Sequence, residues 1–234
     1  MNTIGFDLIS DLNLIPEDSF NWEGKATSLY CIIAGNISQD LRTIKQTLSH
    51  LSKFYQGVFY TLGSLEYHNT DVVAKRTDEI HKACKSIRNL AIMHHHVVVI
   101  DGIAIIGANG WYGNTVETDD VVVNAIVEVH RNEDLIYLKS TIERLQKHLD
   151  VKKIVVVSNS APNEELYFGE HPKHLENQLH MSMSLISDTE NKVSHWLYGT
   201  YGKVVDTNIN GINYINNGCF KRNPYWAKRI EITL

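Results

Sequence analysis

"VFYTLGSLEY", residues 58–67, is the stretch of sequence that decides the fold. The apolar run Val58-Phe59-Tyr60 predicts a buried strand, and Gly63-Ser64-Leu65-Glu66 predicts a loop at its end. A loop that follows a rigid strand is where enzymes often place catalytic groups. Glu66 is the one ionisable carboxylate in this loop, and Leu65 beside it is apolar where chemistry would need a polar side chain.

Four other apolar strands are also followed directly by small or polar residues, at 10–13, 34–36, 158–162 and 198–202. Loops that converge from several strand ends form a site in an α/β fold. The sequence therefore predicts one site, lined by Asp11, Asn13, Asn36, Ser64, Asn159 and Thr200.

Strand patterns and helical patterns alternate along the chain. The stretch 94–111, "HHHVVVIDGIAIIGANGW", contains two strands around an Asp101-Gly102 turn, which is a strong hairpin signal. Other strands are predicted at 4–9, 29–33, 58–62, 153–157, 194–197, 203–207, 212–216 and 227–232. Helices are predicted at 41–54, 71–90, 118–148 and 178–188, the second with Asn69 or Thr70 as its N-cap. We expect one α/β domain, residues 1–234, with mixed sheets rather than one parallel sheet.

Composition limits the class of protein. The chain has 234 residues, of which 43% are hydrophobic, and a formal net charge of −5. A net negative charge argues against binding a nucleic-acid backbone. The three cysteines are widely spaced and predict reduced thiols in a cytoplasmic protein. Neither a secretion signal nor a membrane span is indicated.

The loops resemble the motifs of the calcineurin-like metallophosphoesterase family, particularly its small bacterial and phage phosphohydrolases. The family's DxH motif falls on Asp11-Leu12-Asn13 and its GD motif on Gly35-Asn36. Its GNHE motif falls on residues 63–66, a single histidine falls on Asn159, and its GHxH motif falls on 199–202. The resemblance covers the chain from Phe6 to Ile232. It implies a sandwich of two mixed β-sheets flanked by helices, in αββα layers.

The same resemblance implies that the family's chemistry is lost. The family binds two divalent cations, usually manganese, iron or zinc. Of its metal-ligand positions only Asp11 is kept, and the others are Asn13, Asn36, Ser64, Asn159, Thr200 and Gly202. The histidine that assists the leaving group is replaced by Leu65, while its partner Glu66 remains. Neutral oxygen donors cannot replace carboxylates and imidazoles around two divalent ions. We therefore expect no bound cofactor and a catalytically inactive protein that binds a protein partner or a second copy of itself.

Two alternatives stay open at this point. Asp11, Asn13, Asn36, Asn159 and Glu66 offer oxygens that could hold one magnesium or calcium ion in a reduced phosphoesterase site. In the other alternative, a metal-free pocket holds a small phosphate-containing ligand through amides and hydroxyls.

Several other residues are candidates for recognition or metal binding. Trp111 and Tyr112, in a glycine-rich loop, are either recognition residues or packing over the mouth of the former site. His94, His95 and His96 are expected to be exposed near a strand start rather than to bind metal. His171, His174 and His180 are expected in a solvated segment.

Overall fold

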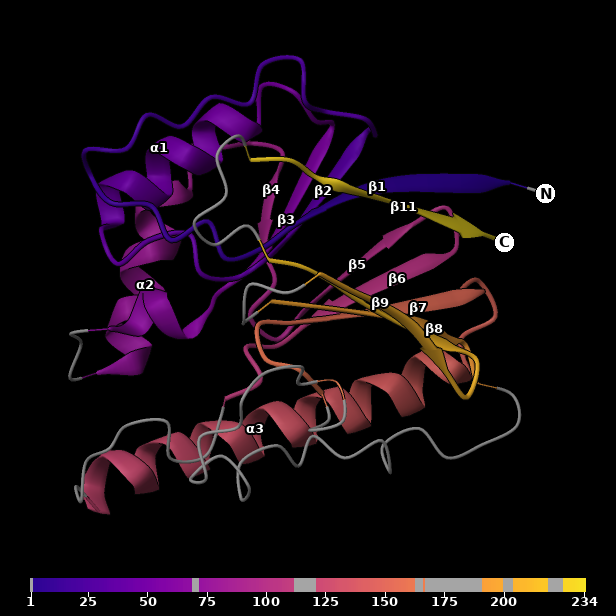
Figure 1. The fold of residues 1–234 in the computed structure, drawn as a ribbon. Helices are drawn as coiled ribbons and strands as arrows, with labels where there is room; N and C mark the ends of the chain where they lie inside the picture. Colours follow the sequence, from indigo (N-terminus) through magenta and orange to yellow (C-terminus); the bar gives the residue numbers. More distant parts are fainter. Residues whose placement is uncertain are drawn as a thin grey trace.

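Two β-sheets packed face to face form the centre of the computed structural model (Figure 1). The structure describes residues 2–68, 72–111, 121–162, 166, 191–199, 204–218 and 225–234, without the side chains of 121–124. The first sheet has the order β11-β1-β2-β3-β4 and the second has the order β5-β6-β7-β8-β10-β9.

In the first sheet β1 to β4 are parallel and β11 is antiparallel to β1. Its strands are β1 (Thr3–Ile9), β2 (Tyr30–Ala34), β3 (Gly57–Thr61), β4 (Leu90–Ile92) and β11 (Lys228–Thr233). In the second sheet β6, β7, β8 and β10 are parallel, and the edge strands β5 and β9 are antiparallel to their neighbours. Its strands are β5 (His96–Ile100), β6 (Ile103–Gly107), β7 (Lys153–Ser158), β8 (Val193–Tyr198), β9 (Val204–Ile209) and β10 (Ile212–Asn217).

Helices cover the outer faces of both sheets. The first sheet carries α1 (Leu41–Leu51) and α2 (Val73–Cys84), and the second carries α3 (Val121–Gln146) (Figure 1). Side chains alternate between these layers because successive residues of a strand point to opposite faces. In β2, Ile33 packs toward the helices whereas Ile32 packs between the sheets. The expected αββα sandwich is confirmed.

The carboxyl ends of the parallel strands of both sheets meet at one end of the sandwich. Ser10, after β1, forms a parallel bridge with Gly218, after β10. The backbone N–H of Asn159, after β7, donates to the carbonyl oxygen of Asn109, after β6, at 2.9 Å. The loops that the sequence singles out therefore lie together.

The helix predicted at 71–90 is too long, because α2 ends at Cys84 and Leu90 begins strand β4. The Asn89 side chain holds the intervening turn by donating to the backbone oxygens of Ser52 and Tyr55, at 2.9 and 2.7 Å. Val72 is the N-cap of α2, while Asn69 and Thr70 lie outside the described residues. The helix predicted at 178–188 also lies outside them.

The expectation for the histidine triplet is wrong for two of its three members. His94 and His95 are half-buried, and only His96 is exposed. His95 Nε2 lies 2.6 Å from the buried carboxylate of Asp134 on α3, and its ring stacks on Tyr137. His95 therefore ties the hairpin to α3.

Among the parts of the chain that the structure describes, no helix is both long enough and apolar enough to cross a membrane.

Candidate functional site

Three residues at the strand ends adopt a backbone conformation that most side chains avoid. Asp11, Asn13 and Asn36 have φ angles of 54°, 48° and 59°. Asn and Asp are the non-glycine residues that tolerate this left-handed region best, because their short side chains can bond locally. Asn13 does so, since its Nδ2 donates to the backbone oxygen of Asp11 at 2.8 Å. The loop geometry thus favours Asn and Asp irrespective of metal binding.

Asn36, in the loop after β2, connects the loop after β1 to the loop after β3. Its Nδ2 donates to Asp11 Oδ1 at 2.8 Å, and its Oδ1 accepts from the backbone N–H of Leu65 at 3.0 Å. The carboxylate can only accept and the backbone N–H can only donate, so these two partners fix which way the amide points. A buried amide donor therefore occupies the side of Asp11 that faces Asn36.

Asn159 makes the equivalent link between the two sheets. Its Oδ1 accepts from the backbone N–H of Ser64, and its Nδ2 donates to the backbone oxygen of Ala34, both at 3.1 Å. The residue is 1% exposed, so both bonds lie away from water. Asn159 thereby connects the end of β7 to the loops after β2 and β3.

Glu66 completes this group, which we call the amide cluster: Asp11, Asn36, Glu66 and Asn159. Its carboxylate accepts from the backbone N–H groups of Asn36, Ile37 and Gly63 at 3.1, 2.6 and 2.7 Å. Burial raises the pKa of Glu66, and the donation from Ile37 and Gly63 acts in the opposite direction. Glu66 therefore holds two loops together and has little capacity left for another partner.

The amide cluster is closely packed as well as internally bonded. A Cβ at Gly35 would overlap Asn159 Nδ2, and a Cβ at Gly63 would overlap Asn36 Oδ1. A Cβ at Gly199 would overlap the backbone oxygen of Ala34. These glycines let three loops approach the asparagine amides, and the space between the loops is filled by the protein itself.

The residues of the amide cluster do not fit a pair of transition-metal ions. Asp11 is the one carboxylate among the predicted ligand positions, and Asn36 donates a hydrogen bond to it. The part of the chain that the structure describes has no group of three or more His, Cys, Asp or Glu side chains able to hold a metal ion. Neutral amides supply neither the charge nor the nitrogen ligands that such ions need.

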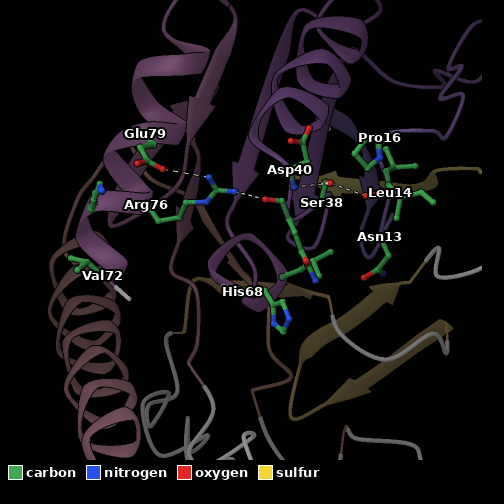
Figure 2. Close-up of a pocket in the computed structure, with 13 residues that line it drawn as sticks. Asn13, Leu14, Pro16, Ser38, Asp40, His68, Val72, Arg76 and Glu79 are labelled. Carbon is green, nitrogen blue, oxygen red and sulfur yellow. Dashed lines mark hydrogen bonds and ion pairs between the residues drawn. The ribbon is translucent and has the colours of Figure 1, made fainter. Parts of the chain in front are cut away.

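An open cavity of about 780 Å³ adjoins the amide cluster (Figure 2). It lies between the loop after β1, the start of α1, and α2, and both Asn13 and Leu65 line it. Its other lining residues are Leu14, Ile15, Pro16, Ser38, Gln39, Asp40, His68, Val72, Lys75, Arg76 and Glu79. This volume is in the range of small-molecule pockets. Apolar side chains from the β1 loop and polar ones from α2 give it a mixed character.

Arg76 forms one wall of this cavity, and no motif in the sequence signals it. Its Nε donates to the backbone oxygen of Glu66 at 2.9 Å, and its Nη2 donates to the backbone oxygen of Gln39. Figure 2 shows the guanidinium reaching toward Glu79, whose Oε2 lies 3.4 Å from Nη1. Arg76 therefore connects α2 to two site loops.

Asn216 was also missed by sequence reasoning. Its Nδ2 donates to the backbone oxygen of Gly199 at 2.8 Å, and its Oδ1 accepts from the backbone N–H of Gly218 at 2.6 Å. The run of asparagines at 216–217 after an apolar strand was its only signal in the sequence.

The remaining candidates are placed in part. Trp111 is half-buried, with its ring centroid 4.8 Å from that of Tyr67 and 5.5 Å from that of His130, so it packs within the protein. Its role in recognition stays a prediction. Ser64 is exposed at the start of the short helix η1 (Ser64–Tyr67). Several predicted residues lie outside the described residues: Tyr112, His171, His174, His180, Thr200 and Gly202.

Solved structures resemble this one over nearly the whole chain. Phosphopantetheinyl hydrolase (PptH) from Mycobacterium tuberculosis superimposes with a TM-score of 0.67 and 15% identity, covering 96% of this chain and 95% of that one. The chain has the calcineurin-like metallophosphoesterase fold. A putative 5'-nucleotidase from Staphylococcus aureus has a TM-score of 0.58 and 11% identity over 93% of this chain and 49% of that one. By sequence, no family model and no curated protein matches.

Proposed function

We propose that this protein is a catalytically inactive relative of the metallophosphoesterases that acts by binding a protein partner or a ligand. The observation that carries the proposal is the hydrogen bond from Asn36 Nδ2 to Asp11 Oδ1 at 2.8 Å. In a dinuclear centre these positions would hold carboxylates facing cations. Here the amide N–H of Asn36 donates to the Asp11 carboxylate, so the protein itself supplies a partner for this oxygen.

The loss of proton transfer supports the same proposal. Leu65 stands where the family has the histidine that assists the leaving group, and its side chain carries no proton to donate. Without a metal ion, an attacking water keeps a pKa near that of bulk water. Neither half of the hydrolytic reaction is then assisted by the residues of the amide cluster.

Metal content and hydrolysis test the proposal together. We expect the purified protein to contain substoichiometric manganese, iron and zinc by mass spectrometry. We also expect no manganese-dependent hydrolysis of bis(p-nitrophenyl) phosphate above a no-protein control. Two metals per chain, or manganese-dependent turnover that Asp11→Ala abolishes, would overturn the proposal.

Asn36→Asp provides a matched comparison. The variant places a second carboxylate next to Asp11, and two carboxylates so close cannot both ionise without a cation. We expect it to lose about 2 kcal/mol of stability at pH 7 and to regain part of it with added Mn²⁺ or Ca²⁺, by linkage of binding to folding. The melting temperature of the natural protein should not respond to these ions. An equal response from both proteins would favour a reduced site that already holds a single cation.

The open cavity favours a second candidate function, the binding of a small phosphate-containing ligand. Inorganic phosphate and a nucleoside monophosphate are the probes for this candidate, with the melting temperature as the readout. A stabilisation that Lys75→Ala removes would support it, because Lys75 lines the cavity and forms no ion pair among the described residues.

A further inference from the structure

The connection between β1 and β2 runs beside α1 (Figure 1). Its residues 14–22, which we call the strap, separate two cavities. Leu14 and Pro16 line both the open cavity of about 780 Å³ and a second cavity of about 400 Å³. The other side of the second cavity is formed by side chains of α1, among them Thr47 and His50. The strap is therefore a common wall of two cavities, with space between it and the helix.

Hydrogen bonds attach the strap to the rest of the described chain at its two ends. At the first end, the backbone N–H of Leu14 donates to the loop after β2 at 2.8 Å. At the second end, the backbone N–H of Trp22 donates to His50 Nε2 at 3.0 Å, and its Nε1 donates to the Tyr55 hydroxyl at 2.8 Å. Between these ends, the hydrogen bonds of residues 15–21 with other described residues reach no further than residue 25. The two ends therefore hold the strap.

His50 holds the second end of the strap only in its neutral form. A backbone N–H can donate but not accept, so the Nε2 atom that receives the Trp22 N–H carries no proton. A protonated imidazole has an N–H group at both ring nitrogens, and one of them would face the N–H of Trp22. His50 also contacts the strap through Phe20, whose ring meets the imidazole edge-on with centroids 5.9 Å apart. Protonation of His50 therefore removes the backbone hydrogen bond to the strap.

The surroundings of His50 favour the neutral form at pH 7. Burial lowers the pKa of His50, the positive charge of Lys53 lowers it further, and Glu23 raises it. Asp18 of the strap and Lys45 of α1 line the second cavity together with His50. Among the described residues, His50 forms no ion pair that would stabilise its charged form. The backbone hydrogen bond to the strap is therefore present above the ordinary pKa of 6.5 and is lost as pH falls through the lower folded-state pKa.

We infer that the strap is an acid-sensitive wall of the open cavity, and that protonation of His50 detaches the second end of the strap from α1. The side chain of Trp22 stays in place as the pivot, because it is fully buried and its bond to Tyr55 does not involve a histidine. Burial raises the pKa of Tyr55, so this hydroxyl stays protonated at acid and neutral pH. Residues 15–21 then move away from α1, and the two cavities join.

Detachment of the strap changes the shape of the open cavity. Ile15 and Pro16 belong to the strap and line the cavity, so a ligand that contacts them at pH 7 loses these contacts at acid pH. As a means of regulating a bound ligand, the inference rests on the proposed binding function of the open cavity. The movement of the strap itself needs no ligand, so it can be tested on the protein alone.

Amide hydrogen exchange, measured by NMR at pH 7 and pH 5 and corrected for the intrinsic exchange rate, tests the inference. In the natural protein we expect the protection of the Trp22 amide to fall roughly three- to tenfold at pH 5, while the amides of β2 keep their protection. His50→Gln keeps an acceptor oxygen and does not titrate, so its Trp22 amide should be equally protected at both pH values. His148→Gln is the matched control, because His148 is exposed after α3 and this variant should respond as the natural protein does.

Either of two results would overturn the inference: a Trp22 amide that is equally protected at both pH values in the natural protein, or a loss of protection at pH 5 that His50→Gln shares. If His50→Gln fails to fold, a ¹⁵N NMR titration of His50 in the natural protein decides the question. We expect a proton on Nδ1 alone at pH 7 and a midpoint below 6.5, and a proton on Nε2 or a higher midpoint would contradict the inference. Metal content and hydrolysis are measured separately, so failure of the strap leaves the proposed function standing.

Discussion

The amide cluster and the open cavity next to it are built from the same loops but differ in how their polar groups are used. In the cluster, the side-chain amides of Asn36 and Asn159 each donate one hydrogen bond to another loop and accept one from another loop. Glu66 accepts three hydrogen bonds from backbone N–H groups. In the cavity, Asn13 and Leu65, close neighbours of those residues in sequence, border a space of about 780 Å³. Neighbouring residues of the same loops thus serve two purposes: some hold the loops together and others line an accessible surface.

The difference teaches where change is tolerated. A buried polar group that loses its partner costs about 1–3 kcal/mol, whereas a substitution on an open surface usually changes stability by about 0.5 kcal/mol or less. If the amide cluster stabilises the fold and the cavity lining does not, variants in the cluster should lose more stability than variants in the cavity.

The largest effect is expected from Gly199→Ala. The added methyl group would overlap the backbone oxygen of Ala34, which cannot move without shifting β2. We expect a loss of about 3 kcal/mol, measured by urea denaturation. Gly24→Ala is the control, because a Cβ there meets nothing and only its φ of 71° opposes the change. Equal losses at the two positions would contradict close packing of the cluster.

Glu66→Gln is expected to have an intermediate effect that depends on pH. The glutamine side chain has one acceptor oxygen for three backbone N–H donors, so we expect the variant to lose about 2 kcal/mol of stability. Burial raises the pKa of Glu66 in the folded state above that in the unfolded state. Its contribution to the free energy of unfolding is therefore greatest below its ordinary pKa of 4.5 and declines as pH rises through the folded-state pKa. The difference in unfolding free energy between the natural protein and Glu66→Gln should narrow from pH 4 to pH 7. A difference that widens would mean that the fold stabilises the charged form of the carboxylate.

The smallest effect is expected at the rim of the cavity. Ile15 is 55% exposed, so Ile15→Ser and Ile15→Thr should each change stability by about 0.5 kcal/mol or less. The same variants should weaken any ligand or partner that occupies the cavity. A loss above about 1.5 kcal/mol would show that the cavity walls are part of the core, and the comparison would fail.

Much of the fold was predictable because its signals are local. The apolar runs of β1, β2, β3 and β7 and the Asp101-Gly102 turn follow from side-chain alternation and from residues that accept positive φ. The convergence of the site loops followed from parallel strands ending at one edge. The end of α2 was not predictable in this way, because the turn that follows the helix is held by contacts of Asn89 with Ser52 and Tyr55, more than thirty residues earlier.

The sequence by itself predicted that the family's metal ligands are absent, since that prediction depends on residue identity at the positions the resemblance matches. Only the tertiary structure decided what the residues at these positions bond to. Asn36 and Asn159 bond to Leu65 and Ser64 across separations of 29 and 95 residues, and Arg76 and Asn216 reach the same loops without any motif. A side-chain amide carries both a donor and an acceptor, so its partners depend on which backbone groups the fold brings within about 3 Å, and no local pattern specifies them.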